Sequence, residues 1–219
     1  MEYKTVHPLY LAQLSRSSYL LTNARKTMKP ERKVVRSKRH TSIIQTFGDR
    51  RIIATSGSRD FEHVWMNMDL RTIPLNDTTR FHRGFYRGAE ELWNELEKEV
   101  DQTEDPLLFT GHSMGGAISV ALAHFVQNAS PSRHVHVVTF GSPRYASSEK
   151  ALKPTFPIDN FVLEYDLVIK LPQYMRHMGK LRTIPTSDLP NPYHPRGIVR
   201  YHSIEHYIDK LKRTPTPWM

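Results

Sequence analysis

Residues 106–127, PLLFTGHSMGGAISVALAHFVQ, determine how the rest of the chain is interpreted. A short apolar run typical of a buried strand comes first, and an apolar helical spacing comes last. Between them lies a Gly-x-Ser-x-Gly motif, formed by Gly111, Ser113 and Gly115. Strand, motif and helix in direct succession predict a turn tight enough to raise the serine hydroxyl above a sheet, with no room for Cβ atoms at the two glycines.

This context predicts that Ser113 is a nucleophile, with His112 beside it in the turn. The first amides of a helix point their N–H groups toward nearby negative charge, so the N–H of Met114 is expected to stabilise an oxyanion formed beside Ser113. The alternative is a Gly-rich strand-to-helix turn without chemistry. The buried strand before the motif and the small-residue helix after it favour the nucleophile.

Length and composition indicate one globular domain. The chain has 219 residues, of which 38% are hydrophobic and none is cysteine. The lack of cysteine excludes disulfides and thiolate metal sites and favours a reducing compartment. No signal peptide is recognisable, and no run approaches the ~20 apolar residues of a membrane span. We therefore expect a cytoplasmic or peripheral membrane location, and no cofactor or metal.

The charge distribution favours anionic partners. The formal net charge is +9, and residues 25–39 hold eight Lys or Arg against one acid, Glu31. This stretch is interpreted either as a solvated basic loop or as an electrostatic contact with an anionic membrane surface, where each cation contributes ~1 kcal/mol. Aromatic residues are not interleaved with these charges, so nucleic-acid binding is not expected.

Hydrophobic periodicity predicts an α/β fold with a mostly parallel central sheet, helices on both faces and an N-terminal antiparallel hairpin turning at Gly48-Asp49. We place an N-terminal helix and basic segment at 1–41 and the α/β domain at 42–219, within a single globular unit. The stretch 172–195 is rich in proline and is expected to be loop. The expected helices are 7–23, 61–68, 85–100, 118–125 and 203–212, and the expected strands are 42–47, 51–55, 107–110, 134–140, 161–165 and 198–201.

A nucleophilic serine needs a base, and the base needs an acid to fix its tautomer. On α/β-hydrolase sheets these groups follow the order Ser, acid, His along the chain. Asp166 comes at the C-terminal end of an expected strand, at the same edge of the sheet as the turn that holds Ser113. Asp159 precedes that strand and is expected at the opposite edge. His202 precedes the last helix, and His206 lies off the apolar face of that helix. We therefore predict Ser113, Asp166 and His202 as the catalytic triad.

Several sequence blocks in this order resemble the class 3 (fungal-type) triacylglycerol lipases, which have the α/β-hydrolase fold. The resemblance covers roughly residues 42–211. The blocks are IIATSGSRDFEHVW at 52–65, HRGFYRGAEELW at 82–93, GHSMGGA at 111–117, VVTFGSPR at 137–144, YDLVIKLP at 165–172 and YHSIEHYIDKL at 201–211.

The resemblance implies that the oxyanion is held by the Met114 N–H and by the hydroxyl of Ser58. The family's Phe-Arg-Gly-Thr is Thr-Ser-Gly-Ser at 55–58 here, so its Arg and its aromatic residue are absent. The resemblance also implies a lid in the helix that follows, and packing of that helix into the core is the alternative. The apolar stripe of this possible lid consists of Phe61, Val64, Trp65 and Met68.

By this likeness the chain is expected to be a serine carboxylic-ester hydrolase acting on lipids such as triacylglycerol or diacylglycerol. Two alternatives use the same machinery, a phospholipase A1 and an acyltransferase. A third, of a different class, is a catalytically silent lipase-like binding domain.

Overall fold

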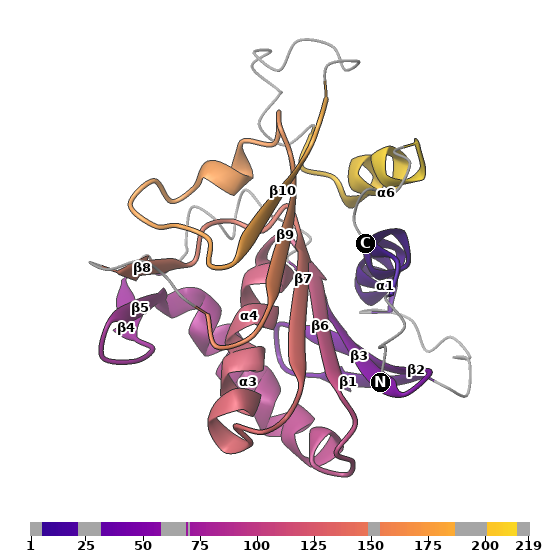
Figure 1. The fold of residues 1–219 in the computed structure, drawn as a ribbon, viewed down its shortest axis with the longest axis vertical. Helices are drawn as coiled ribbons and strands as arrows, with labels where there is room; N and C mark the ends of the chain where they lie inside the picture. The colour runs from indigo at the N-terminus through magenta and orange to yellow at the C-terminus, as the bar shows by residue number, and fades with distance from the viewer. Residues whose placement is uncertain are drawn as a thin grey trace.

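The computed structural model describes residues 6–21, 32–57, 69, 71–148, 154–186 and 201–213. Its centre is a seven-stranded sheet in the order β1-β2-β3-β6-β7-β9-β10 (Figure 1). The first three strands are antiparallel neighbours, and all later neighbours are parallel, which confirms the predicted hairpin and parallel sheet. The strands are β1 (Arg32–Arg36), β2 (Thr41–Phe47), β3 (Arg50–Thr55), β6 (Leu107–His112), β7 (Val135–Phe140), β9 (Ile158–Leu163) and β10 (Lys180–Ile184).

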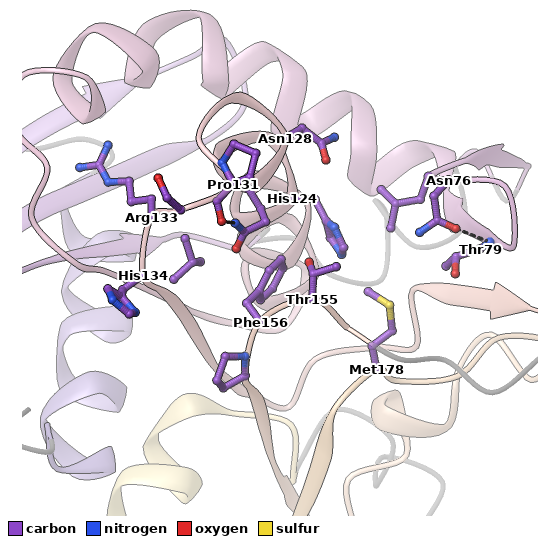
Figure 2. A pocket seen from close by; sticks show the side chains of 15 residues that line it. Asn76, Thr79, His124, Asn128, Pro131, Arg133, His134, Thr155, Phe156 and Met178 are labelled. Carbon is purple, nitrogen blue, oxygen red and sulfur yellow. Dashed lines mark hydrogen bonds between the residues drawn. The ribbon is translucent and has the colours of Figure 1, made fainter.

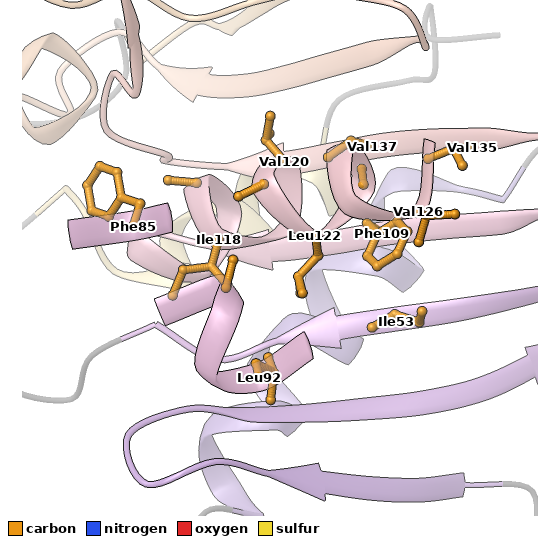
Figure 3. Packing of buried hydrophobic residues seen from close by; sticks show 14 of the residues in the cluster. Ile53, Phe85, Leu92, Phe109, Ile118, Val120, Leu122, Val126, Val135 and Val137 are labelled. Carbon is orange, nitrogen blue, oxygen red and sulfur yellow. The ribbon is translucent and has the colours of Figure 1, made fainter. Parts of the chain in front are cut away.

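Helices cover both faces of this sheet (Figure 1). On one face lie α3 (Arg83–Val100) and α4 (Met114–Ala129), and on the other lie α1 (Pro8–Leu20) and α6 (Ile204–Arg213). The apolar side chains of α3 and α4 interlock with those of β3, β6 and β7, including Leu92, Ile118 and Phe109 (Figure 3). Because β3, β6, β7, β9 and β10 are parallel neighbours, their carboxyl ends lie at the same edge of the sheet. Within the described part of the chain, no helix is long and apolar enough to cross a bilayer.

The structure corrects several sequence-based boundaries. Residues 32–36 form strand β1 at the edge of the sheet and are not loop. The Pro-rich stretch contains β10, which pairs with β9 in parallel. Of the expected strand 198–201, only Tyr201 is described, and it lies in a turn. A second, three-stranded sheet was not predicted, and it consists of β4 (Thr72–Pro74), β5 (Thr79–His82) and β8 (Ala146–Ser148).

Candidate active site

Ser113 stands in the turn between β6 and α4 with a strained backbone. Its φ of 56° is the one positive value among the described residues other than glycine, and its side chain is buried. The neighbouring glycines make the turn possible, because a Cβ on Gly111 would lie 2.4 Å from backbone atoms of Gly115. A Cβ on Gly115 would lie 2.3 Å from the backbone oxygen of Thr55. The predicted tight turn is therefore present, and it packs directly against the end of β3.

A chain of hydrogen bonds joins the three side chains of the predicted triad. His202 Nε2 lies 2.7 Å from Ser113 Oγ, and His202 Nδ1 lies 2.9 Å from Asp166 Oδ2. All three residues are buried. The carboxylate accepts the Nδ1 proton, so Nε2 is left bare and able to accept the proton of the serine hydroxyl. The arrangement can activate a serine for attack on a carbonyl carbon.

Among the described residues, three groups hold the carboxylate of Asp166. Besides His202, the backbone N–H of Val168 donates to Oδ1 at 2.9 Å and the hydroxyl of Tyr207 donates to Oδ2 at 2.7 Å. Burial and the nearby Asp166 charge raise the pKa of Tyr207 well above its usual value, so the hydroxyl keeps its proton. Tyr207 lies on the buried face of α6, and nothing in the sequence marks its hydroxyl as a hydrogen-bond donor to Asp166.

The two residues that were not chosen for the triad, His206 and Asp159, make other contacts in the structure. His206 is on α6, where its ring contacts Tyr201 at a centroid distance of 5.8 Å. Asp159 is the second residue of β9, inside the strand that it was expected to precede, and it pairs with His136 and Arg182. The length of β9 separates the two aspartates, since Asp159 is the second residue of the strand and Asp166 follows its last residue, Leu163.

The oxyanion side of the site is described in part. Met114 is the first residue of α4, so its N–H has no acceptor within the helix. The backbone at Gly57 lies against Ser113, because a Cβ there would be 3.3 Å from Ser113 Cβ. Ser58 and the possible lid residues lie outside the described residues, and their roles remain predictions; the lid residues are Phe61, Val64, Trp65 and Met68.

A cavity of about 620 Å³ lies beside the second half of α4. Its lining includes His124 and Asn128 of that helix and, from a separate segment, Thr155 and Phe156 (Figure 2). His124 is about three helical turns from Ser113, and the cavity contains none of the predicted site residues. We therefore do not assign the ester substrate to it.

Comparison with known families gives one match that spans more than half of the chain. The family model described as lipase (class 3) matches residues 52–175, which include Ser113 and Asp166 but not His202. None of the curated proteins compared with the chain matches its sequence.

Solved structures of fungal lipases share the fold. The triacylglyceride lipase of Rhizomucor miehei is 20% identical over 91% of this chain and 91% of its own, with a TM-score of 0.65. A triacylglycerol lipase described as having a serine protease triad at its catalytic centre is 21% identical, with 91% of each chain covered and a TM-score of 0.66. The Lip2 lipase of Yarrowia lipolytica is 15% identical over 80% of this chain and 76% of its own, with a TM-score of 0.64.

Proposed function

Because the chain belongs to the class 3 lipases and is thereby a serine ester hydrolase, we propose that it cleaves acyl esters of glycerolipids with Ser113, His202 and Asp166. The observation that carries this proposal is the unbroken series of hydrogen bonds from Ser113 Oγ through the His202 ring to Asp166. Triacylglycerol and diacylglycerol are the proposed substrates, since triacylglycerol lipases are among the solved structures with this fold.

In the proposed mechanism, Ser113 Oγ attacks the ester carbonyl carbon while its proton passes to His202 Nε2. The buried carboxylate of Asp166 stabilises the imidazolium ion that forms, and its three hydrogen-bond donors keep it in place. The negative charge on the carbonyl oxygen is stabilised by the N–H of Met114 at the start of α4 and by the hydroxyl of Ser58.

Collapse of the tetrahedral intermediate breaks the ester C–O bond, and His202 gives its proton to the departing alcohol. The acyl group then remains on Ser113 Oγ. A water molecule attacks this acyl-enzyme while His202 Nε2 takes one of its protons, and the second collapse releases a fatty acid and restores the serine hydroxyl. No step requires a cofactor.

Ser113→Ala tests the proposal directly. The substitution removes one oxygen and leaves the elbow backbone in place, so we expect hydrolysis of a soluble p-nitrophenyl ester to fall by about 10⁴-fold or more while the melting temperature is retained. Labelling by a fluorophosphonate probe should be lost as well. Near-wild-type turnover by purified Ser113→Ala protein would contradict the assignment of the nucleophile.

A substrate panel separates the remaining possibilities. We expect triacylglycerol and diacylglycerol emulsions to be hydrolysed faster than phospholipid. A preference for phospholipid cleaved at the first acyl position would indicate a phospholipase A1, and transfer of the acyl group to an added alcohol would indicate an acyltransferase. Absence of both turnover and probe labelling in well-folded wild-type protein would indicate a silent binding domain.

A further inference from the structure

His112, the residue before the nucleophile, holds the backbone of the proposed base. Its Nε2 lies 2.6 Å from the backbone oxygen of His202, and the two rings are stacked obliquely with centroids 4.8 Å apart. A carbonyl oxygen can only accept a hydrogen bond. His112 Nε2 must therefore carry the proton in this contact, because a bare nitrogen would place two lone pairs against each other.

The same ring has only one proton to give. His112 is buried, and burial lowers its pKa well below the usual value, so the imidazole is neutral. With the proton on Nε2, Nδ1 is a bare acceptor. The hydroxyl of Tyr19 lies 3.0 Å from that atom. Although the Tyr19 ring is partly exposed, its hydroxyl is enclosed, and this burial raises its pKa, so it has a proton to donate.

The hydroxyl of Tyr19 makes further contacts. The backbone oxygen of His112 is a second acceptor for its one proton at 3.2 Å, slightly farther than Nδ1 at 3.0 Å, and the hydroxyl oxygen accepts the backbone N–H of Gly57. A Cβ on Gly57 would lie 2.3 Å from this hydroxyl, so the approach is close. Tyr19 therefore joins the turn that carries the nucleophile to the strand end that leads to Ser58.

We propose that Tyr19 is a positioning residue: its hydroxyl donates to His112 Nδ1 and so fixes the tautomer in which His112 Nε2–H holds the backbone of His202 beside Ser113. Tyr19 would thus act on His112 as Asp166 acts on His202, since in each case a polar group at Nδ1 determines which ring nitrogen carries the proton. Tyr19 belongs to α1, outside the residues 52–175 that match the family model. The inference rests on the proposed catalytic role of His202.

The tautomer can be observed without any activity. In protein labelled with ¹⁵N at its histidines, the His112 signals are identified by their loss in His112→Gln. We expect the wild-type ring to be protonated at Nε2 and bare at Nδ1, and Tyr19→Phe to shift the ring toward the other tautomer. Protonation at Nδ1 in the wild type, or an unchanged ring in Tyr19→Phe, would overturn the proposal.

Kinetics test the consequence for catalysis. Tyr19→Phe is expected to lower kcat for a soluble p-nitrophenyl ester by about 10- to 100-fold with KM unchanged, because a small displacement of the base is costly. Tyr10→Phe is the matched control, since Tyr10 lies on the same helix and contacts Phe47. The control should retain kcat, and melting temperatures of both variants show whether folding is preserved.

A double-mutant cycle isolates the path through His112. The amide of His112→Gln can donate to the His202 backbone oxygen without needing a particular tautomer. Tyr19→Phe should therefore reduce kcat much less in the His112→Gln background, although Gly57 loses its acceptor in both. An equal fold-loss in the two backgrounds would overturn the proposal. If the wild-type protein hydrolyses no ester, the proposed function fails, and the ¹⁵N measurement still decides the tautomer.

Discussion

Gly141 shows how closely the carboxylate of Asp166 is enclosed. Its φ is +56°, and a Cβ there would lie 3.0 Å from both Asp166 Oδ2 and the Tyr207 hydroxyl. We expect Gly141→Ala to lower kcat by about tenfold or more, because the new methyl group displaces the carboxylate from His202. The left-handed backbone should also lower the free energy of unfolding by ~1–2 kcal/mol. Ester hydrolysis and urea unfolding measure the two effects separately.

Gly48 provides the matched control for this substitution. Its φ is +62°, and a Cβ there would meet nothing within 4 Å. Gly48→Ala therefore shares the backbone cost without crowding any side chain. The Gly141 variant should lose at least as much stability as the Gly48 variant, because it adds crowding to the same backbone cost, and only the Gly141 variant should lose kcat. Equal kcat in wild type and Gly141→Ala would show that the carboxylate tolerates the displacement.

Single residues differ in how far sequence could identify them. Ser113 has a local signature, and the order of acid and base along the chain led to Asp166 and His202, which the structure brings into hydrogen-bond contact. Tyr19 and Tyr207 carry no such signature. Each lies on a helix whose pattern indicates only a packed face, and the contacts of their hydroxyls depend on how distant elements meet.

At the scale of elements, strand β1 belongs to the basic segment 25–39, for which we predict contact with an anionic membrane surface. Replacing Arg32, Lys33, Arg36 and Lys38 by Gln is expected to weaken sedimentation with vesicles of acidic lipid at low salt, because each cation near an anionic surface contributes ~1 kcal/mol. The effect should fade as salt rises. Turnover of a soluble ester should not change, since Arg32, Lys33 and Arg36 lie on edge strand β1 and Lys38 lies in the bend that follows it, away from the triad.

The pairing of β1 supplies the competing outcome. Three of its cations already have acceptors on the protein, namely Gln45 for Arg32, Glu99 for Lys33 and the backbone oxygen of Leu21 for Arg36. If the basic side chains serve to stabilise the fold through these contacts, the four substitutions will lower the melting temperature and leave vesicle binding unchanged. That result would contradict the prediction of membrane contact.

Elements with strong local signals were predictable, and elements that depend on distant partners were not. The hairpin of β2 and β3 has Gly48 at its turn, and α3 has a continuous apolar stripe, so both were found. Strands β4, β5 and β8 have only three or four residues each, too few for a period to be recognised. Strand β10 is largely exposed at the sheet edge, so its residues lack the alternation that marks a half-buried strand.

For the whole molecule, buried histidines should make stability sensitive to acid. Burial lowers the pKa of His40, His82 and His124 to about 4. In the unfolded chain these groups titrate near 6.5, so between about pH 6.5 and 4 the unfolded state binds protons that the folded state does not. The free energy of unfolding should therefore fall as pH decreases through this window and level off below it. Urea unfolding across the range measures the slope.

One variant tests the cause of that slope. His124 packs edge-on against Phe156 with its Nε2 unpaired among the described residues, so His124→Leu should make the decline with acid shallower. A slope that is the same in this variant and in the wild type would assign the acid sensitivity to other groups.

The contact of α1 with β6 and α6 also has a consequence for synthesis of the protein on the ribosome. Tyr19 and His112 are 93 positions apart, and Arg16 pairs with Glu205 on α6. At ~5–20 residues per second, α1 is made roughly 5–20 s before β6 and waits longer still for α6. During that interval its apolar side chains, including Leu11 and Leu14, have no sheet to cover. The apolar face of α1 is thus left uncovered during synthesis, and the contacts of α1 with β6 and α6 can form only after His112 and Glu205 have emerged.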